Sequence, residues 1–439
     1  MDDLVKTGRR DDRTATLSRV LLYIGIACGV IGLVFLELGR GYSFANEWDF
    51  TRFAFTSSNY RPWTLFTDLS QICFLCIIPI VVARKPIRMI LVPLFAIGGY
   101  VIYSMIEVFG LGTAPLDALF GSASTVVFLI PLFYILATDS DLLETMRRIA
   151  PWLALLYLVL TAWSTVNFYM ACGWGSQIGW YPAREFYSSA VCYCWFVCLG
   201  CFNNGRMSSY SFKITLSALL AVLGFLLLVR SWVIQATLLM LAVTFLQQDG
   251  SKRMRRMGHV MMCSIALVVV ASSFFPTVFE SFAGRFGDDT RSGQYETFFA
   301  QVDPASLILG NGYSASYVYG DNPSYRAFDN QLIYTAFHFG IIPSLVYFAV
   351  ILAVVVSGFR MFSRSPQMRG ASLACAFHLA ATIGLSTFFS YTVSPGIVFL
   401  FALFGVAIYE GARRREKDCR APEIEDNGCR NRHAVLSNR

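Results

Sequence analysis

Runs of about twenty apolar residues recur along almost the whole chain, and they constrain the fold more than any other feature of the sequence. In hydrocarbon, backbone amides and carbonyls must hydrogen-bond within their own segment. Runs of this length are therefore typical of membrane-spanning helices, not of the alternating strands of about ten residues in a barrel. Only 14% of the 439 residues are charged, against roughly 25% in soluble domains. The sequence predicts an all-α fold, a polytopic membrane helix bundle.

We expect about twelve transmembrane helices. They cover residues 18–37, 65–83, 89–109, 119–137, 150–170, 187–203, 213–229, 231–247, 258–275, 331–358, 371–389 and 392–410. Lys and Arg gather in alternate connectors, so by the positive-inside rule these connectors and both termini face the cytoplasm. The first run lacks an obvious small-residue cleavage site, and we expect it to stay as a span and not to be removed as a signal peptide.

Three parts are expected along the chain: a cytoplasmic N-terminus at 1–17, the transmembrane bundle at 18–411, and a disordered, polar cytoplasmic tail at 412–439. The formal net charge of +7 follows from the basic connectors and needs no nucleic-acid partner. Most of the 12 cysteines fall inside spans, so no disulfide framework is implied. Cys198 and Cys201 have CxxC spacing without a nearby His or acid, which indicates packing and not metal binding.

The segment 276–330 is the one long polar interruption of the apolar pattern, and on the predicted topology it faces outward. It combines Arg285, Arg291 and Arg326 with several carboxylates and with repeated Gly and Tyr. A membrane scaffold with one such polar loop is expected to carry its site there. We therefore predict a functional site in this loop, with short helices inside it.

Two local structures are expected within this loop. Apolar side chains recur at helical spacing after Arg291: Tyr295, Phe298, Phe299 and Val302. This pattern predicts a short amphipathic helix that lies on the membrane surface or on other helices. Further on, Gly310 and Gly312 predict a tight turn with exposed backbone amides. Such turns can hold phosphate, although two glycines in a loop are more often only a turn.

Two further arginines lie at the outer ends of predicted spans. Arg230 interrupts the apolar run 214–245, and two helices of about sixteen residues each would leave Arg230 and Ser231 in a tight turn at the outer boundary. A charge at this level is unfavourable, so the guanidinium turns to the protein interior or snorkels to headgroup phosphates. Arg184 lies in a short outer connector, where it anchors a helix end at headgroups or contributes to a site.

Asp329 and Asn330 stand at the head of the tenth predicted span. Asp329 is expected to cap this helix, and a capping aspartate at a membrane mouth can also act as a base. His338 and His378 lie inside spans without further ligands at suitable spacing. For both histidines we expect polar packing between helices and no metal.

Arg184, Arg230 and Arg291 come from separate outer connectors and can converge with Asp329 beside the outer leaflet. Guanidinium groups bind phosphate oxygens bidentately, and a low dielectric strengthens that contact. Such a site would fit a lipid diphosphate. A transferase that uses this donor needs no metal or other cofactor, because the arginines neutralise the leaving diphosphate while Asp329 takes the proton of the acceptor hydroxyl.

These residues carry a resemblance to a known family. The segments LLLVRSW, RSGQYETFF followed by LILGNGY, and FDNQLIYTAFHFGIIPSLVYF resemble the O-antigen polymerase and O-antigen ligase superfamily of integral-membrane glycosyltransferases. The resemblance implies transfer of undecaprenyl-diphosphate-linked glycan at the periplasmic face of a bacterial inner membrane. It also allows a flippase and a chain-length regulator as partners.

On this resemblance, the expected catalytic residues are Asp329 and Arg291. The expected substrate-binding residues are Arg184, Arg230, Arg285, Gln294, Gly312, Arg326, Asn330 and Tyr334. The ligase branch has a His-Asn pair where this chain has Asp329 and Asn330, so a polysaccharide polymerase is favoured and a ligase acting on lipid A core is the alternative. A transporter or flippase of lipid-linked sugars is an alternative of another class, although transporters usually place polar residues inside their spans. A structural subunit of an export assembly is a third reading.

Overall fold

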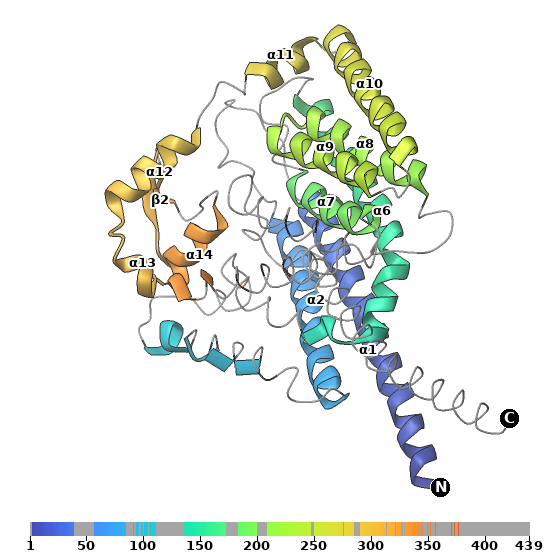
Figure 1. Ribbon diagram of the computed structural model, residues 1–439. Helices are drawn as coiled ribbons and strands as arrows, with labels where there is room; N and C mark the ends of the chain where they lie inside the picture. The colour runs from blue at the N-terminus through green and yellow to red at the C-terminus, as the bar shows by residue number, and fades with distance from the viewer. Residues whose placement is uncertain are drawn as a thin grey trace, which may run out of the picture.

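The structure is a computed structural model, and it describes residues 2–38, 57–84, 135–172, 183–199, 209–246, 250–274, 276–284 and most of 290–345, with parts of 91–110 and isolated positions up to 376. Within these residues the chain is mostly helical (Figure 1). Three helices are long and apolar enough to cross a membrane: Thr14–Leu38, Pro62–Arg84 and Ser140–Met170. They confirm the prediction of a helical multi-pass membrane protein. The described residues do not show all twelve predicted spans, and those at 371–389 and 392–410 lie almost entirely outside them.

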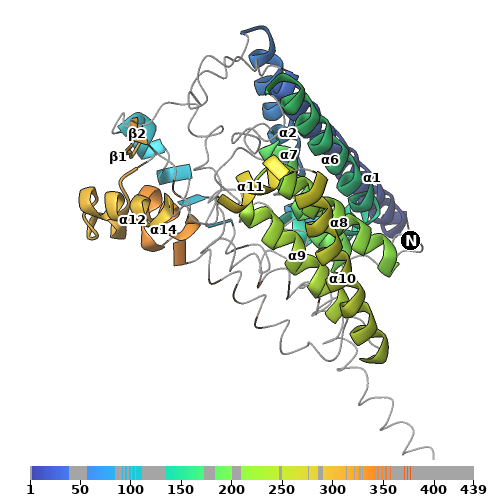
Figure 2. The ribbon, with the colours of Figure 1, turned by 90° about the horizontal axis from the view of Figure 1, so that it is seen from above.

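These three spans belong to α1 (Asp2–Leu38), α2 (Ser57–Arg84) and α6 (Ser140–Cys172). They lie side by side in both ribbon views (Figures 1 and 2). Helix α1 begins at Asp2, so residues 2–17 of the predicted cytoplasmic N-terminus extend the first span as helix. Apolar side chains on the facing sides of these helices form the core of the bundle, with Ile77, Val81 and Ala154 completely buried.

Four shorter elements continue the bundle: α7 (Arg184–Cys198), α8 (Tyr210–Leu226), α9 (Arg230–Phe245) and α10 (Gly250–Phe274). Helix α7 is buried on almost all sides, as expected of a helix that is apolar all round. Cys198 packs within this core, with its sulfur 3.4 Å from the carbonyl oxygen of Lys213. The packing role predicted for this cysteine is confirmed, and Cys201 lies outside the described residues.

The connection between α8 and α9 is tighter than the sequence indicated. The turn consists of Leu227, Leu228 and Val229, and Arg230 is the first residue of α9. Leu228 takes a left-handed conformation with φ of 59°, which a branched residue seldom adopts. This conformation closes the turn early. The prediction that Arg230 and Ser231 form the turn is therefore wrong, because both residues belong to the first turn of α9.

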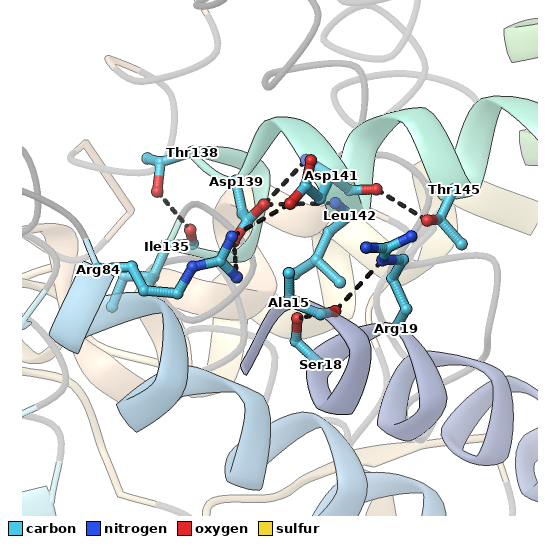
Figure 3. A network of polar contacts seen from close by, with 10 residues as sticks. All are labelled: Ala15, Ser18, Arg19, Arg84, Ile135, Thr138, Asp139, Asp141, Leu142 and Thr145. Atoms are coloured by element: carbon cyan, nitrogen blue, oxygen red, sulfur yellow. Dashed lines mark hydrogen bonds and ion pairs between the residues drawn. The ribbon is translucent and has the colours of Figure 1, made fainter. Parts of the chain in front are cut away.

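An ion-pair network joins the end of α2 to the start of α6 (Figure 3). The terminal nitrogens of Arg84 lie 3.0 Å from Asp139 Oδ2 and 3.1 Å from Asp141 Oδ2. The closer of these contacts is an ion pair without hydrogen-bond alignment. Asp139 is fully buried, and its Oδ1 accepts the backbone N–H groups of Asp141 and Leu142. It therefore caps α6 and pairs with α2 at the same time.

Beside the bundle, the polar loop folds as a small unit that we call the outer subdomain (Figures 1 and 2). It follows α11 (Pro276–Gly284) and consists of α12 (Thr290–Gln301), α13 (Ser306–Leu309), the antiparallel strands β1 (Tyr317–Tyr319) and β2 (Asn322–Tyr325), and α14 (Gln331–Phe339). The helix predicted after Arg291 is confirmed as α12. The β1–β2 hairpin departs from the all-α prediction.

Aromatic side chains form the core of the outer subdomain. Phe298 of α12 is completely buried, and its ring centroid lies 5.1 Å from that of Tyr317, 4.8 Å from that of Phe328 and 5.1 Å from that of Phe337. These edge-to-face contacts are the favoured geometry for aromatic pairs. The apolar face of α12 therefore packs on its own hairpin and on α14, and only Phe299, 45% exposed, turns outward.

Candidate functional site

The structure describes five of the predicted site residues in full: Arg230, Gln294, Gly312, Asn330 and Tyr334. It gives the backbone positions of two more, because Arg184 is the first residue of α7 and Arg291 the second residue of α12. Arg285, Arg326 and the predicted base Asp329 lie outside the described residues, as does His378. Convergence of all three arginines with Asp329 therefore stays a prediction.

The starts of α7 and α9 lie next to each other. Tyr187, in the first turn of α7, stacks on Trp232, in the first turn of α9, with ring centroids 4.0 Å apart. Gly224 of α8 makes this approach possible, because a Cβ there would lie 2.8 Å from the Tyr187 hydroxyl and 3.1 Å from Trp232 Cβ. Arg184 and Arg230, the first residues of these helices, are thereby brought to the same end of the bundle.

Neither of these helix starts is closed by a capping side chain. The N-cap residues are Ala183 and Val229, which have no polar side chain, and neither makes a side-chain cap hydrogen bond. The first N–H groups of a helix have no partner within the helix, and the helix dipole makes this end attractive to anions. Two adjacent uncapped helix starts, each beginning with an arginine, have the composition of an anion site.

Two other predicted binding residues, Gln294 and Tyr334, are buried in the interior of the outer subdomain. Gln294 is 3% exposed, and its Nε2 donates to the Tyr317 hydroxyl at 2.9 Å. Tyr334 is buried with its ring 4.6 Å from that of His338. Both side chains therefore stabilise the interior of the outer subdomain. That each also contacts the substrate stays a prediction.

Asn330, not Asp329, caps α14. Its Oδ1 accepts the N–H groups of Leu332 and Ile333 at 3.0 and 3.3 Å, and its Nδ2 donates to the Tyr295 hydroxyl at 3.0 Å. The Asn330 side chain therefore fixes the start of α14 against α12. The capping role expected of Asp329 passes to its neighbour because Asn330 holds the extended N-cap conformation.

The glycine turn is present, with φ of 82° at Gly310 and 86° at Gly312. Its amides, however, are already used. The N–H of Gly310 donates to Ser306 O at 2.9 Å, that of Asn311 to Phe337 O at 2.7 Å, and that of Gly312 to His338 O at 3.0 Å. The expectation that these amides are exposed and could hold phosphate is therefore wrong, since the turn binds the end of α14 instead.

His338 is 2% exposed, and its Nδ1 lies 3.0 Å from the carbonyl oxygen of Gly312. This confirms the polar packing predicted for it, although the partner is the glycine turn and not another helix. Glu107, a buried carboxylate that lies against this turn, was not predicted from the sequence. The available signal was a single acid at the end of the apolar run 89–109.

The described residues define a mostly helical multi-pass membrane protein with an aromatic outer subdomain. No protein-family model matches the chain, and neither curated proteins nor solved structures give a match. Among the described residues, no group of three or more His, Cys, Asp or Glu side chains is arranged to hold a metal ion.

Proposed function

We propose that this protein polymerises undecaprenyl-diphosphate-linked oligosaccharide repeat units into a surface polysaccharide at the periplasmic face of a bacterial inner membrane. The supporting observation is the pair of adjacent, uncapped helix starts that begin with Arg184 and Arg230. A diphosphate at the headgroup level of the membrane is the anion that this position would meet. The resemblance of the segments around Arg230, Arg291 and Asn330 to membrane glycosyltransferases gives the substrate class.

The reaction is a glycosyl transfer between two lipid-linked glycans. The acceptor hydroxyl attacks the anomeric carbon of the donor, the bond from that carbon to the phosphate oxygen breaks, and the diphosphate leaves with the electron pair. The arginines and the amides at the starts of α7 and α9 neutralise the charge that develops on the diphosphate. A carboxylate at the mouth accepts the hydroxyl proton, and Asp329 is the candidate that the sequence offers.

Removal of the arginines is expected to abolish long polymer. In a host deleted for the gene, complementation with Arg230→Ala or Arg291→Ala should lower polymer formation by about a hundredfold, because each loses a charged donor to the leaving diphosphate. Lysine at either position should also impair transfer, since an ammonium cannot make the bidentate contact. Surface polysaccharide and lipid-linked intermediates resolved on a gel measure both effects.

Arg256→Ala is the matched control. The guanidinium carbon of Arg256 lies 4.3 Å from the ring centroid of Tyr210, at the end of α8 away from Arg230. This variant should retain wild-type polymer. Unchanged polymer length and amount in both arginine variants, with normal insertion, would refute the diphosphate site. Accumulation of single repeat units in the deletion strain identifies a polymerase, whereas long chains left on the carrier lipid identify the ligase alternative.

A further inference from the structure

In the described part of the segment 101–110, large apolar side chains are exposed and the one acidic side chain is buried. Ile102 is 63% exposed, Ile106 52% and Phe109 69%, whereas Glu107 is 7% exposed. The segment ends in a single π-helical turn, Ile106–Gly110, a feature found frequently at functional sites. Burial of an ionisable residue within an apolar segment is unfavourable unless the residue is paired or the protein uses it. The position of Glu107 therefore indicates a role beyond packing.

Glu107 faces the backbone of the glycine turn in the outer subdomain. A Cβ on Gly312 would lie 2.9 Å from Glu107 Oε2 and 3.0 Å from Oε1, so only glycine leaves room for the carboxylate. On the other side, Gly312 is held by His338 through its N–H and its carbonyl oxygen. The carboxylate is thus brought against the turn that precedes the hairpin and α14, some two hundred positions away in sequence.

The same segment has a second, independent attachment. The Tyr103 hydroxyl donates to the carbonyl oxygen of His338 at 3.3 Å, and its ring meets the edge of Phe339 with centroids 6.0 Å apart. Docking of the segment therefore does not depend on Glu107 alone. Tyr103 provides a control for the purely structural part of this contact.

The other described carboxylates of α11 and of the outer subdomain are exposed to solvent. These are Glu280, Glu296 and Asp303. A proton acceptor in a glycosyl transfer works best where water is excluded and the carboxylate is held in place. Of these four acids, Glu107 has that environment.

We propose that Glu107 is a catalytic residue, the base that accepts the proton of the acceptor hydroxyl. This assignment rests on the proposed glycosyl transfer. As the acceptor oxygen bonds to the anomeric carbon, its O–H bond breaks and the proton moves to a carboxylate oxygen of Glu107. The bond between the anomeric carbon and the phosphate breaks in the same step, and its electron pair leaves with the diphosphate. Glu107 takes the place that the sequence offered to Asp329.

The test compares purified full-length variants in liposomes that contain undecaprenyl-diphosphate-linked repeat units. Glu107→Gln preserves the size of the side chain and one acceptor oxygen but cannot accept the proton. We expect kcat to fall by about a hundredfold or more while KM changes by less than about threefold. Tyr103→Phe should retain kcat within about threefold of the wild type, since it loses only the hydrogen bond to the His338 carbonyl oxygen. Asp329→Asn is measured beside it. In Glu107→Ala, added formate should restore part of the lost rate, because it supplies a carboxylate at the vacated position.

Each outcome decides the assignment. Wild-type kcat in Glu107→Gln overturns it, and so does a loss of activity that formate does not restore or that Tyr103→Phe reproduces. Failure of Glu107→Gln to insert would make Glu107 a structural charge and would also overturn it. If Asp329→Asn loses the rate and Glu107→Gln does not, the base is Asp329. If the wild-type protein forms no polymer, the proposed polymerase function itself fails. If the wild type and Glu107→Gln both polymerise at the same rate, only the assignment of Glu107 fails.

Discussion

Gly310→Ala is expected to unfold the outer subdomain while the helix bundle remains intact. The φ of 82° at this position is unfavourable for alanine, and such strain costs about 1–3 kcal/mol. The new Cβ would also lie 2.5 Å from the backbone nitrogen of Gly340 and 2.7 Å from the carbonyl oxygen of His338. Backbone atoms cannot rotate out of the way, and overpacking adds about 1–3 kcal/mol. Hydrogen exchange of peptides from the outer subdomain should show loss of protection.

Substitutions at two other glycines of the outer subdomain distinguish the cost of backbone strain from the cost of steric crowding. Gly320 has φ of 58° but nothing within 4 Å of an added Cβ, so Gly320→Ala should cost only the strain, about 1 kcal/mol. Gly293 lies in α12 with an ordinary φ and open space, so Gly293→Ala should be neutral or stabilising by about 0.5–1 kcal/mol. If hydrogen-exchange protection is equal in Gly310→Ala and Gly320→Ala, crowding of the added Cβ against the end of α14 does not contribute to the destabilisation.

The parts of the outer subdomain that could be predicted from sequence are those set by local pattern. The spacing of Tyr295, Phe298 and Val302 predicts α12, because one face of a helix must be apolar to pack. The Gly310 and Gly312 pair predicts the turn. The direction of the turn's amides could not be predicted, because they donate to the end of α14, which only the folded chain brings near.

The hairpin has only a weak local signal in the sequence. Tyr317 and Tyr319 alternate with Val318, and Gly320 follows, which is the pattern of a short strand and its turn. Strands of three and four residues are too short to be identified by their periodicity. Their stability comes from the aromatic contacts with Phe298 and Phe328, which are tertiary.

The candidate site depends more strongly on tertiary contacts. The sequence identifies Arg184 and Arg230 as unusual, but the stacking of Tyr187 on Trp232 is what brings the two helix starts together. Glu107 and Gly312 come from distant segments, and no local pattern relates them. The left-handed Leu228 likewise has no sequence signature, since glycine or asparagine is the usual residue in that conformation.

Asp139→Ala is expected to destabilise the bundle strongly at the junction of α2 and α6. The side chain is fully buried, and its loss removes one partner of Arg84, whose own side chain is 17% exposed. Removing one partner of a buried pair costs about 3–5 kcal/mol, since the other charge is left desolvated. Loss of the cap on α6 adds about 1 kcal/mol. Because Arg84 keeps Asp141 at 3.1 Å, we expect the loss of the ion pair to cost about 3 kcal/mol, and the total with the lost cap to be about 4 kcal/mol.

Asp141→Ala and Asp139→Asn show which part of this loss is due to charge. Asp141 is 44% exposed, so its pair with Arg84 is screened and its removal should cost about 0–1 kcal/mol. Asparagine caps helices about as well as aspartate, so Asp139→Asn should keep the cap and lose only the ion pair. Thermal unfolding in detergent should therefore give the order Asp141→Ala, Asp139→Asn, Asp139→Ala, with the lowest midpoint last. If Asp139→Ala and Asp141→Ala unfold at the same temperature, the buried pair does not hold α2 to α6, and the apolar contacts between these helices alone determine their packing.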